Sequence, residues 1–433
     1  MMLFLISPLD GFDEGAHMHW ASVMADTLAG YSHDNPEGTL LISKAEINSG
    51  LTDNTPDHDY YTWCIDELSK RTSDASTLME IEKDTVHKGE FPSALFFFYA
   101  IGILFARHMS LTGVGIAFLA RLFGMIPLIA MIIYILRRLP FGMELVYAIL
   151  SLPITMQSIA TINPDGEILV LSLALTAATI HQMLSCREEK RTWHDLIDYG
   201  IIVISCALLS LCKYGAMIPL CLIPLLILLR RKTVKKSATI MALIVSAGSF
   251  FGAFLPMLIR LFQERRTSSW SEYYTFSEVF SHPLHSFRIL LATIDMWSGY
   301  WSRQIIGTML GNVNILISDA YVMLYTALLV VAMFVTGAHF SKLRRIEWMA
   351  FAGIGILGTL CSMGGMMVGA TPSGFEVING VQGRYFLPFL FPILAAIAPR
   401  KIHLEEENKI KEGFVAILPL ILCFVLTSIF LQS

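Results

Sequence analysis

Charged residues are scarce in this chain: Asp, Glu, Lys and Arg make up 15% of its 433 residues, whereas 55% are hydrophobic. This composition argues against a water-soluble domain and against a nucleic-acid partner, which would need a basic surface. Long apolar runs recur from Phe91 to Phe430, and several reach the roughly 20 residues with which a helix crosses a bilayer. We therefore expect an all-α, polytopic membrane protein with about 11 to 12 apolar segments, because helices satisfy their own backbone in lipid.

Cysteine and metal-binding patterns are also sparse. Most of the seven cysteines lie in or beside apolar runs, which predicts structural thiols and no disulfide framework. A closed set of His and Cys ligands is missing, so we expect no cofactor. A divalent metal is the alternative, because Asp13, Glu14, His17 and His19 offer mixed ligands at helical spacing.

Acidic residues are concentrated near the beginning of the chain. Between Asp10 and Glu90 there are 17 acidic and 5 basic residues, which leaves the remainder with a net charge of +8. This predicts a water-facing acidic loop at 7–90, with helices at 16–28 and around 61–68 and an irregular stretch at 72–90. Residues 1–6 are expected to be the remnant of a first transmembrane helix, and residues 91–433 a transmembrane domain with an outer segment at 263–312.

Basic residues cluster in connectors between the apolar runs. These connectors are Arg137-Arg138, 186–191, 230–236, 342–345 and Arg400-Lys401. Placing them all in the cytoplasm follows the positive-inside tendency and puts the acidic loop outside. An odd number of crossings is then required between Glu90 and Arg137, where two apolar runs occur. Either the run at 91–106 is re-entrant or interfacial, or the arginine pair breaks the rule.

Acids and cations are expected to meet at the outer side. Asp13 and His17 share one face of a helix that begins after a Pro- and Gly-containing stretch, although Asp13 as a plain N-cap is the alternative. Lys213 lies between two apolar runs, 201–211 and 214–229, that are short for a bilayer, and Arg384 begins another short run. Such cations either snorkel to lipid phosphate or hold a phosphate substrate while a carboxylate handles a proton.

Three motifs are similar to those of a known family. They are Phe-Asp-Glu-Gly-Ala-His at 12–17, Asn-Pro-Asp-Gly at 163–166 and Gly-Val-Gln-Gly-Arg-Tyr-Phe-Leu-Pro at 380–388. They resemble the hallmarks of a bacterial multi-pass family catalogued as domain of unknown function 2142. The resemblance extends over nearly the whole chain. That family in turn resembles, more distantly, the GT-C glycosyltransferases, including protein mannosyltransferases and the lipid A aminoarabinose transferase.

The resemblance implies sugar transfer from a polyprenyl-phosphate-linked donor to a cell-envelope polysaccharide or glycolipid acceptor, at the outer face of the bacterial plasma membrane. Asp13 matches the general base, Glu14 its partner and Asp165 a second outer acid, which gives the catalytic set. From charge and depth we add two cations as substrate-binding residues. With the neighbouring motif residues, the predicted substrate-binding set is His17, Lys213, Gln382, Arg384 and Tyr385.

Two other interpretations stay open. A transporter or flippase of lipid-linked sugars would also need sunken cations and outer acids, although the internal repeat common in transporters is not evident. A membrane metal-dependent hydrolase would use Asp13, Glu14 and His17.

Overall fold

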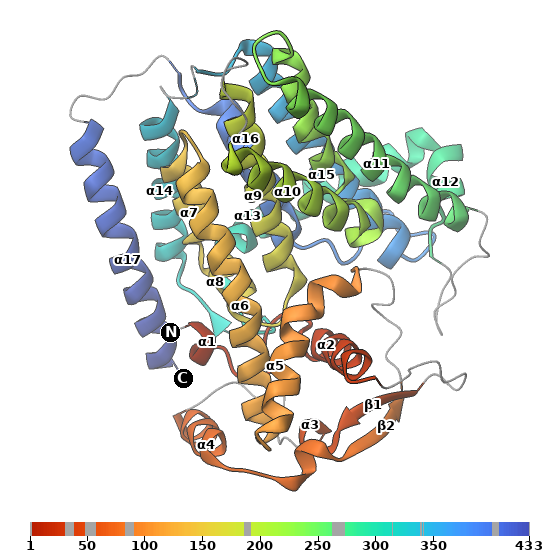
Figure 1. Cartoon of the computed structure of the whole chain (residues 1–433), viewed down its shortest axis with the longest axis vertical. Helices are drawn as coiled ribbons and strands as arrows, with labels where there is room; N and C mark the ends of the chain where they lie inside the picture. The colour runs from red at the N-terminus through yellow and green to blue at the C-terminus, as the bar shows by residue number, and fades with distance from the viewer. Residues whose placement is uncertain are drawn as a thin grey trace.

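Helices make up most of the protein (Figure 1). The computed structural model describes residues 2–30, 39–47, 58–82, 91–185, 192–261, 273–313, 315–337, 340, 342–400 and 407–432. Within these residues, six helices are long and apolar enough to cross a membrane, and a bent helix pair makes a seventh if it counts as one span. The polytopic, all-α membrane fold predicted from composition is confirmed.

The apolar elements of the described residues are six long helices, one bent helix pair and several shorter segments. The six long ones are α6 (Gly113–Arg138), α9 (Pro164–Leu184), α10 (Trp193–Leu211), α14 (Asp319–Gly337), α15 (Arg345–Ala370) and α17 (Glu407–Gln432). The bent pair is α7 (Met143–Leu150) and α8 (Pro153–Ala160), and shorter apolar elements are α5 (Phe97–His108), η4 (Ile218–Arg230), α11 (Lys236–Leu261) and α16 (Leu387–Ile397). Helix α9 forms the centre of the bundle, since 89% of its most apolar stretch is buried.

The remaining elements are short or polar. Before α5 come α1 (Met2–Leu5), α2 (Glu14–Leu28), β1 (Thr39–Ser43), α3 (Lys44–Ile47), α4 (His58–Ser69), η1 (Ser73–Ser76), β2 (Leu78–Glu82) and η2 (Ser93–Phe96). Later come η3 (Cys212–Gly215), α12 (Phe276–Ser281), α13 (Pro283–Ile306), β3 (Met309–Leu310), β4 (Ile315–Leu316) and η6 (Gly383–Phe386). The first part of the expected outer segment, 263–272, lies outside the described residues.

The expectation of an irregular stretch at 72–90 is wrong for its first half. Strand β2 pairs antiparallel with β1, from Thr39 opposite Glu82 to Ser43 opposite Leu78. The partner strand lies far earlier in the chain, so no local hairpin turn signals the pairing. Residues 83–90 lie outside the described part, whereas α2 and α4 stand where the sequence predicts helices.

Two apolar segments also differ from their predicted form. The run at 141–161 is broken, because α7 and α8 meet at 70° just before Pro153, which cannot continue the hydrogen bonds of α7. Helix α10 begins at Trp193 instead of near 201, since Asp195 and Asp198 are buried and paired. Its 19 residues extend about 28 Å, so the argument that both arms beside Lys213 are unusually short is wrong for the first arm.

The lengths of the two helices before Arg137 bear on how many times this part of the chain crosses the membrane. Helix α5 has 12 residues, fewer than the roughly 20 that span a bilayer, whereas α6 has 26. The two run antiparallel, with Tyr99 against Gly124 and Gly102 against Ala120, so α5 covers the first half of α6 alone. This length fits a re-entrant or interfacial α5 and a single crossing by α6.

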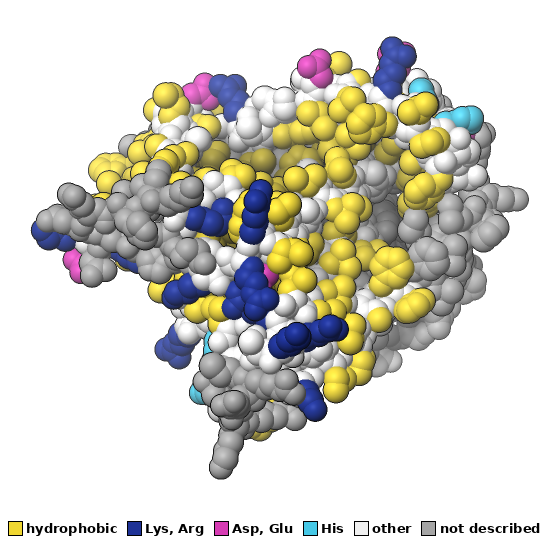
Figure 2. Space-filling view, turned by 90° about the horizontal axis from the view of Figure 1, so that it is seen from above, with side chains coloured by type: hydrophobic (Ala, Val, Ile, Leu, Met, Phe, Trp, Pro, Cys, Tyr) yellow, Lys and Arg dark blue, Asp and Glu magenta, His cyan; other side chains and the backbone are white. Residues whose placement is uncertain are grey.

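The described basic connectors lie together at one end of the bundle. Arg138 pairs with Asp198 and Lys235 with Asp195, both at the start of α10. Arg230 donates a hydrogen bond to the Lys342 carbonyl at 2.7 Å, which joins the connector at 342–345 to the one at 230–236. Seen from that end, Figure 2 shows Lys and Arg side chains gathered across the face. This is the arrangement that a common cytoplasmic placement requires.

Candidate functional site

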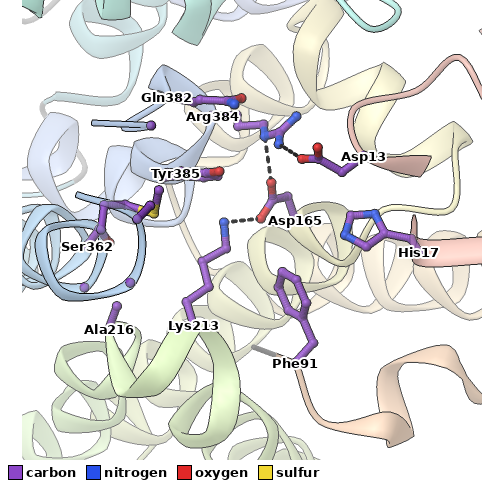
Figure 3. A pocket seen from close by; sticks show the side chains of 15 residues that line it. Asp13, His17, Phe91, Asp165, Lys213, Ala216, Ser362, Gln382, Arg384 and Tyr385 are labelled. Carbon is purple, nitrogen blue, oxygen red and sulfur yellow. Dashed lines mark hydrogen bonds and ion pairs between the residues drawn. The ribbon is translucent and has the colours of Figure 1, made fainter. Parts of the chain in front are cut away.

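A cavity of about 250 Å³ lies at the other end of the same helices. From the connector end, α9 runs back to Asp165, α10 runs forward to Lys213, and α16 runs back to Arg384. The cavity is lined by every predicted site residue except Glu14: Asp13, His17, Asp165, Lys213, Gln382, Arg384 and Tyr385 (Figure 3). Asp13 and Arg384, which are 371 positions apart in sequence, therefore meet at one place.

Asp13 stands immediately before α2 but does not cap it with its side chain. Its backbone is left-handed, with φ of 54°, a conformation that Asp tolerates better than most residues. The carboxylate points to the cavity, where Oδ2 lies 2.6 Å from Arg384 Nη2, and 43% of the side chain is exposed. The simple N-cap interpretation of Asp13 does not describe this geometry.

Arg384 is buried because the motif around it packs tightly on α13. A Cβ at Gly383 would lie 2.5 Å from the Trp301 carbonyl oxygen, so only glycine lets the backbone approach this closely. The Gly383 N–H donates to Gln304 Oε1 at 2.7 Å. The Arg384 side chain is 4% exposed, and its Cζ lies 4.3 Å from the centre of the Phe12 ring. The guanidinium is thus shielded from water on one face and open to the cavity on another.

Asp165 joins the two cations. Asn163 caps α9 by accepting a hydrogen bond from the Asp165 N–H, and a Cβ at Gly166 would lie 2.4 Å from the Ser158 carbonyl oxygen. These contacts fix the first turn of α9 against α8. The Asp165 carboxylate, 8% exposed, lies 2.6 Å from Lys213 Nζ through Oδ1 and 3.0 Å from Arg384 Nε through Oδ2. With both oxygens held by cations, Asp165 is built to position charge.

Lys213 is held by the turn between α10 and η4. Its backbone is left-handed, with φ of 47°, which is uncommon for a long side chain and marks a constrained position. The Nζ atom lies 3.4 Å from the centre of the Tyr385 ring and 5.8 Å from that of Phe91. A cation–π contact of this kind stabilises an ammonium that water does not reach.

His17 comes from the next turn of α2 after Asp13. Its Nδ1 lies 3.1 Å from the Ile162 carbonyl oxygen, an acceptor, so Nδ1 carries the proton. The ring meets Phe91 edge-on, with 5.7 Å between centroids. The hydrogen bond and the ring contact orient the imidazole at the side of the cavity, beside Asp165 (Figure 3).

Glu14 points away from the cavity, although it is adjacent to Asp13. It is fully buried and its two oxygens accept from Arg121 at 2.7 and 2.6 Å. The same carboxylate accepts from the N–H groups of Gly11 and Ile162, both at 2.9 Å. Arg121 in turn donates to the carbonyls of Leu3, Ile6 and Ser7. Glu14 therefore anchors the segment that precedes α2, whereas the adjacent Asp13 faces the cavity.

The wall opposite the charges was not predicted. It consists of Ser362, Gly365, Met366, Gly369 and Ala370 on one face of α15, together with Ala216. These residues are small or flexible, so the wall is smooth and largely apolar. Their spacing of three and four in an apolar run was the signal, but small residues at that spacing are common in any helix that packs in a membrane.

A metal site finds no support in the described part of the chain, where no three His, Cys, Asp or Glu side chains lie close enough to hold an ion. The cavity instead holds two carboxylates and two cations, joined in a chain from Asp13 to Lys213. Such a chain can bind an anion and move a proton without further groups.

Comparison with known proteins gives a family but no characterised relative. No curated protein and no solved structure matches the chain. The model of the family described as "Predicted membrane protein (DUF2142)" matches residues 1–393, which include all three motifs and every residue of the cavity. The chain therefore belongs to the DUF2142 family of predicted membrane proteins.

Proposed function

We propose that this protein is a GT-C-like glycosyltransferase, which transfers a sugar from a polyprenyl-phosphate donor to a cell-envelope acceptor. The observation that carries the proposal is the junction of Asp13, Arg384, Asp165 and Lys213 in one cavity. A carboxylate that is partly exposed and two cations that are almost fully buried are the groups that such a transfer needs.

In the proposed step, Asp13 takes the proton of the acceptor hydroxyl as its oxygen attacks the anomeric carbon. The bond between that carbon and the phosphate oxygen breaks, and the polyprenyl phosphate leaves with the electron pair. Arg384 and Lys213 stabilise the negative charge on the leaving phosphate. Asp165 is a positioning residue, because its oxygens hold both cations at 2.6 and 3.0 Å.

The two walls of the cavity support an amphiphilic substrate. One wall is charged, whereas the α15 wall is small and apolar. A ligand with a phosphate and a long apolar chain satisfies both walls at once, whereas a soluble nucleotide sugar would leave the apolar wall in contact with polar groups.

The position of the cavity supports transfer at the outer face. The basic connectors mark the cytoplasmic end under the positive-inside tendency, and the cavity lies at the opposite ends of α9, α10, α15 and α16. Polyprenyl-linked donors would reach it from the outer leaflet, in a bacterial plasma membrane.

The proposal is tested with membranes that contain the wild type or the Asp13→Asn variant, incubated with a radiolabelled polyprenyl-phosphate sugar. We expect label in the acceptor fraction for the wild type and loss of about 1,000-fold for the variant. Asp319→Asn is the matched control, because Asp319 pairs with Arg303 on the exposed surface, away from the cavity. Equal transfer by Asp13→Asn and wild type would remove Asp13 from the reaction.

The same membranes discriminate the flippase alternative. Wild type and Asp13→Asn are each reconstituted into proteoliposomes. If both carry the labelled lipid across the bilayer at the same rate and no label reaches an acceptor, the protein moves lipid-linked sugars without chemistry. Chelator-sensitive release of free sugar would favour a metal-dependent hydrolase instead.

A further inference from the structure

In this structure the Asp13 carboxylate, the proposed base, is paired with the Arg384 guanidinium, the proposed phosphate site. Asp13 Oδ2 lies 2.6 Å from Arg384 Nη2. A carboxylate paired with a guanidinium is a weak base, and a guanidinium covered by a carboxylate is a weak phosphate site. Both groups need to separate before the proposed reaction begins, so the resting pair holds the site inactive.

The two acids that contact Arg384 differ in how firmly they are held. Asp165 is 8% exposed and forms ion pairs with two buried cations, so removing it would leave buried charges unpaired. Asp13 is 43% exposed, and its side chain makes no cap bond to α2. Separating Asp13 from Arg384 costs less than removing Asp165, because water solvates the half-exposed Asp13 and Arg384 keeps Asp165 as a counter-ion. Asp13 is therefore the partner that an incoming group can replace.

Arg384 also has capacity for a new ligand. Its Nη1 and Nε atoms are buried and make no hydrogen bond within the described residues, although Nε lies 3.0 Å from Asp165 Oδ2, and the side chain lines the cavity. A guanidinium that keeps Asp165 on Nε can offer Nη1 and Nη2 together to two oxygens of one phosphate. An unpaired buried donor of this kind is costly, and a phosphate oxygen would satisfy it.

We propose that the singly charged phosphodiester of the lipid-linked donor replaces Asp13 on Arg384, so that donor binding releases the base. This inference rests on the proposed function for the roles of Asp13 and the phosphate. The exchange replaces one negative charge on Arg384 by another, and the displaced Asp13 carboxylate, 43% exposed, keeps its own charge in contact with water. A diphosphate would bring an additional charge to the resting site, where Lys213 is paired with Asp165 and contacts the Tyr385 ring, whereas in the proposed step that charge develops only as the sugar leaves.

The exchange predicts an unusual variant, in which loss of a carboxylate strengthens ligand binding. Farnesyl methyl phosphate, a phosphodiester, is titrated into the purified full chain in detergent micelles by isothermal calorimetry. Asp13→Asn should bind it about five-fold more tightly than the wild type, since the competing carboxylate is gone. Asp13→Glu, which keeps the charge, and Asp319→Asn, which removes a remote one, should bind it as the wild type does. Neutral farnesol should not distinguish the four proteins.

Equal or weaker binding of the phosphodiester by Asp13→Asn would overturn the exchange, provided that thermal unfolding matches that of the wild type. If Asp13→Asn does not fold, Asp13→Ser takes its place with the same expectation. Tighter binding of farnesyl diphosphate than of the phosphodiester by the wild type would overturn the one-for-one charge argument. Should Asp13→Asn bind more tightly while the wild type transfers no sugar, the exchange stands and the proposed glycosyl transfer fails.

Discussion

Two clusters of buried charge lie at opposite ends of α9 and α10, and they are built differently. At the connector end, Asp198 is fully buried and accepts five hydrogen bonds, from Tyr134, Arg138, His181 and Gln182. At the cavity end, Asp13 is 43% exposed and Arg384 Nη1 has no hydrogen-bond partner in the described part of the chain.

The difference indicates that the Asp198 cluster holds helices together, whereas the Asp13 cluster is available for chemistry. A carboxylate surrounded by donors can neither accept a substrate nor take up a proton without breaking the cluster, so the Asp198 end serves as a clamp between helices. An ion pair beside an open cavity, with left-handed backbone at Asp13 and Lys213, retains strain and unused bonding capacity. Opposite effects of substitution are therefore expected at the two ends.

The largest effect is expected at the cavity end, on activity. Asp13→Asn should lower the initial rate of sugar transfer about 1,000-fold, since no other half-exposed carboxylate lines the described cavity. Its unfolding temperature should fall less than that of Asp198→Asn, because Asp13 is half exposed and Arg384 keeps Asp165 as a counter-ion. A variant with full activity and a large drop in unfolding temperature would make the two ends alike and refute the comparison.

The next effect is the reverse, a loss of stability at the connector end. Asp198→Asn should lower the free energy of unfolding by about 3 kcal/mol, because Arg138 loses its buried counter-ion and Tyr134 and His181 lose a charged partner. Thermal unfolding in detergent measures this change. Transfer per folded molecule should be unchanged, which separates the variant from Asp13→Asn.

A smaller effect should come from filling the cavity from its apolar wall. A Cβ at Gly365 would lie 3.5 Å from Ala216 Cβ, so Leu fits at the backbone but extends into the cavity. Gly365→Leu should lower kcat/KM by about 10- to 100-fold through loss of substrate space. Gly364→Leu is the matched control, since no atom lies within 4 Å of its Cβ position. Equal loss in both variants would mean that helix α15, and not the cavity, was perturbed.

The sequence locates the cavity charges but not their partners. Cations in the middle of apolar sequence are rare, so Lys213 and Arg384 stand out, as does the acid of the Asn-Pro-Asp-Gly motif. Asp13 and Glu14 look equivalent in sequence, yet Asp13 stands before α2 with a left-handed backbone and contacts Arg384, whereas Glu14 is the first residue of α2 and contacts Arg121. Only the fold tells which arginine each acid meets.

Other parts of the fold depend on pairings that are distant in sequence. The first turn of α10 looks like a polar loop because Asp195 and Asp198 stand there, and their counter-ions Lys235 and Arg138 lie 40 and 60 residues away. The β1–β2 sheet is hidden in the same way, since its strands are separated by the whole of α4. Long apolar helices were predictable, because their signal is local composition.

The smallest effect concerns a third cluster, which has an unequal charge count. Arg107 pairs with both Asp26 and Glu46, at 2.6 and 2.9 Å. Among the ion pairs of the described residues, two carboxylates thus contact one arginine here, whereas the cavity and connector clusters each pair two acids with two cations. Burial raises the pKa of Glu46 above its usual value near 4.5, and the neighbouring Asp26 adds to the rise. A raised pKa means that the folded state binds more protons than the unfolded chain as pH increases beyond 4.5. The free energy of unfolding should therefore fall as pH rises through the folded-state pKa.

Glu46→Gln, which cannot ionise, should flatten this dependence in thermal unfolding measured from pH 4.5 to 8. An unchanged slope in the variant would assign the pH dependence to another group and leave the 2:1 cluster electrostatically equivalent to the paired ones.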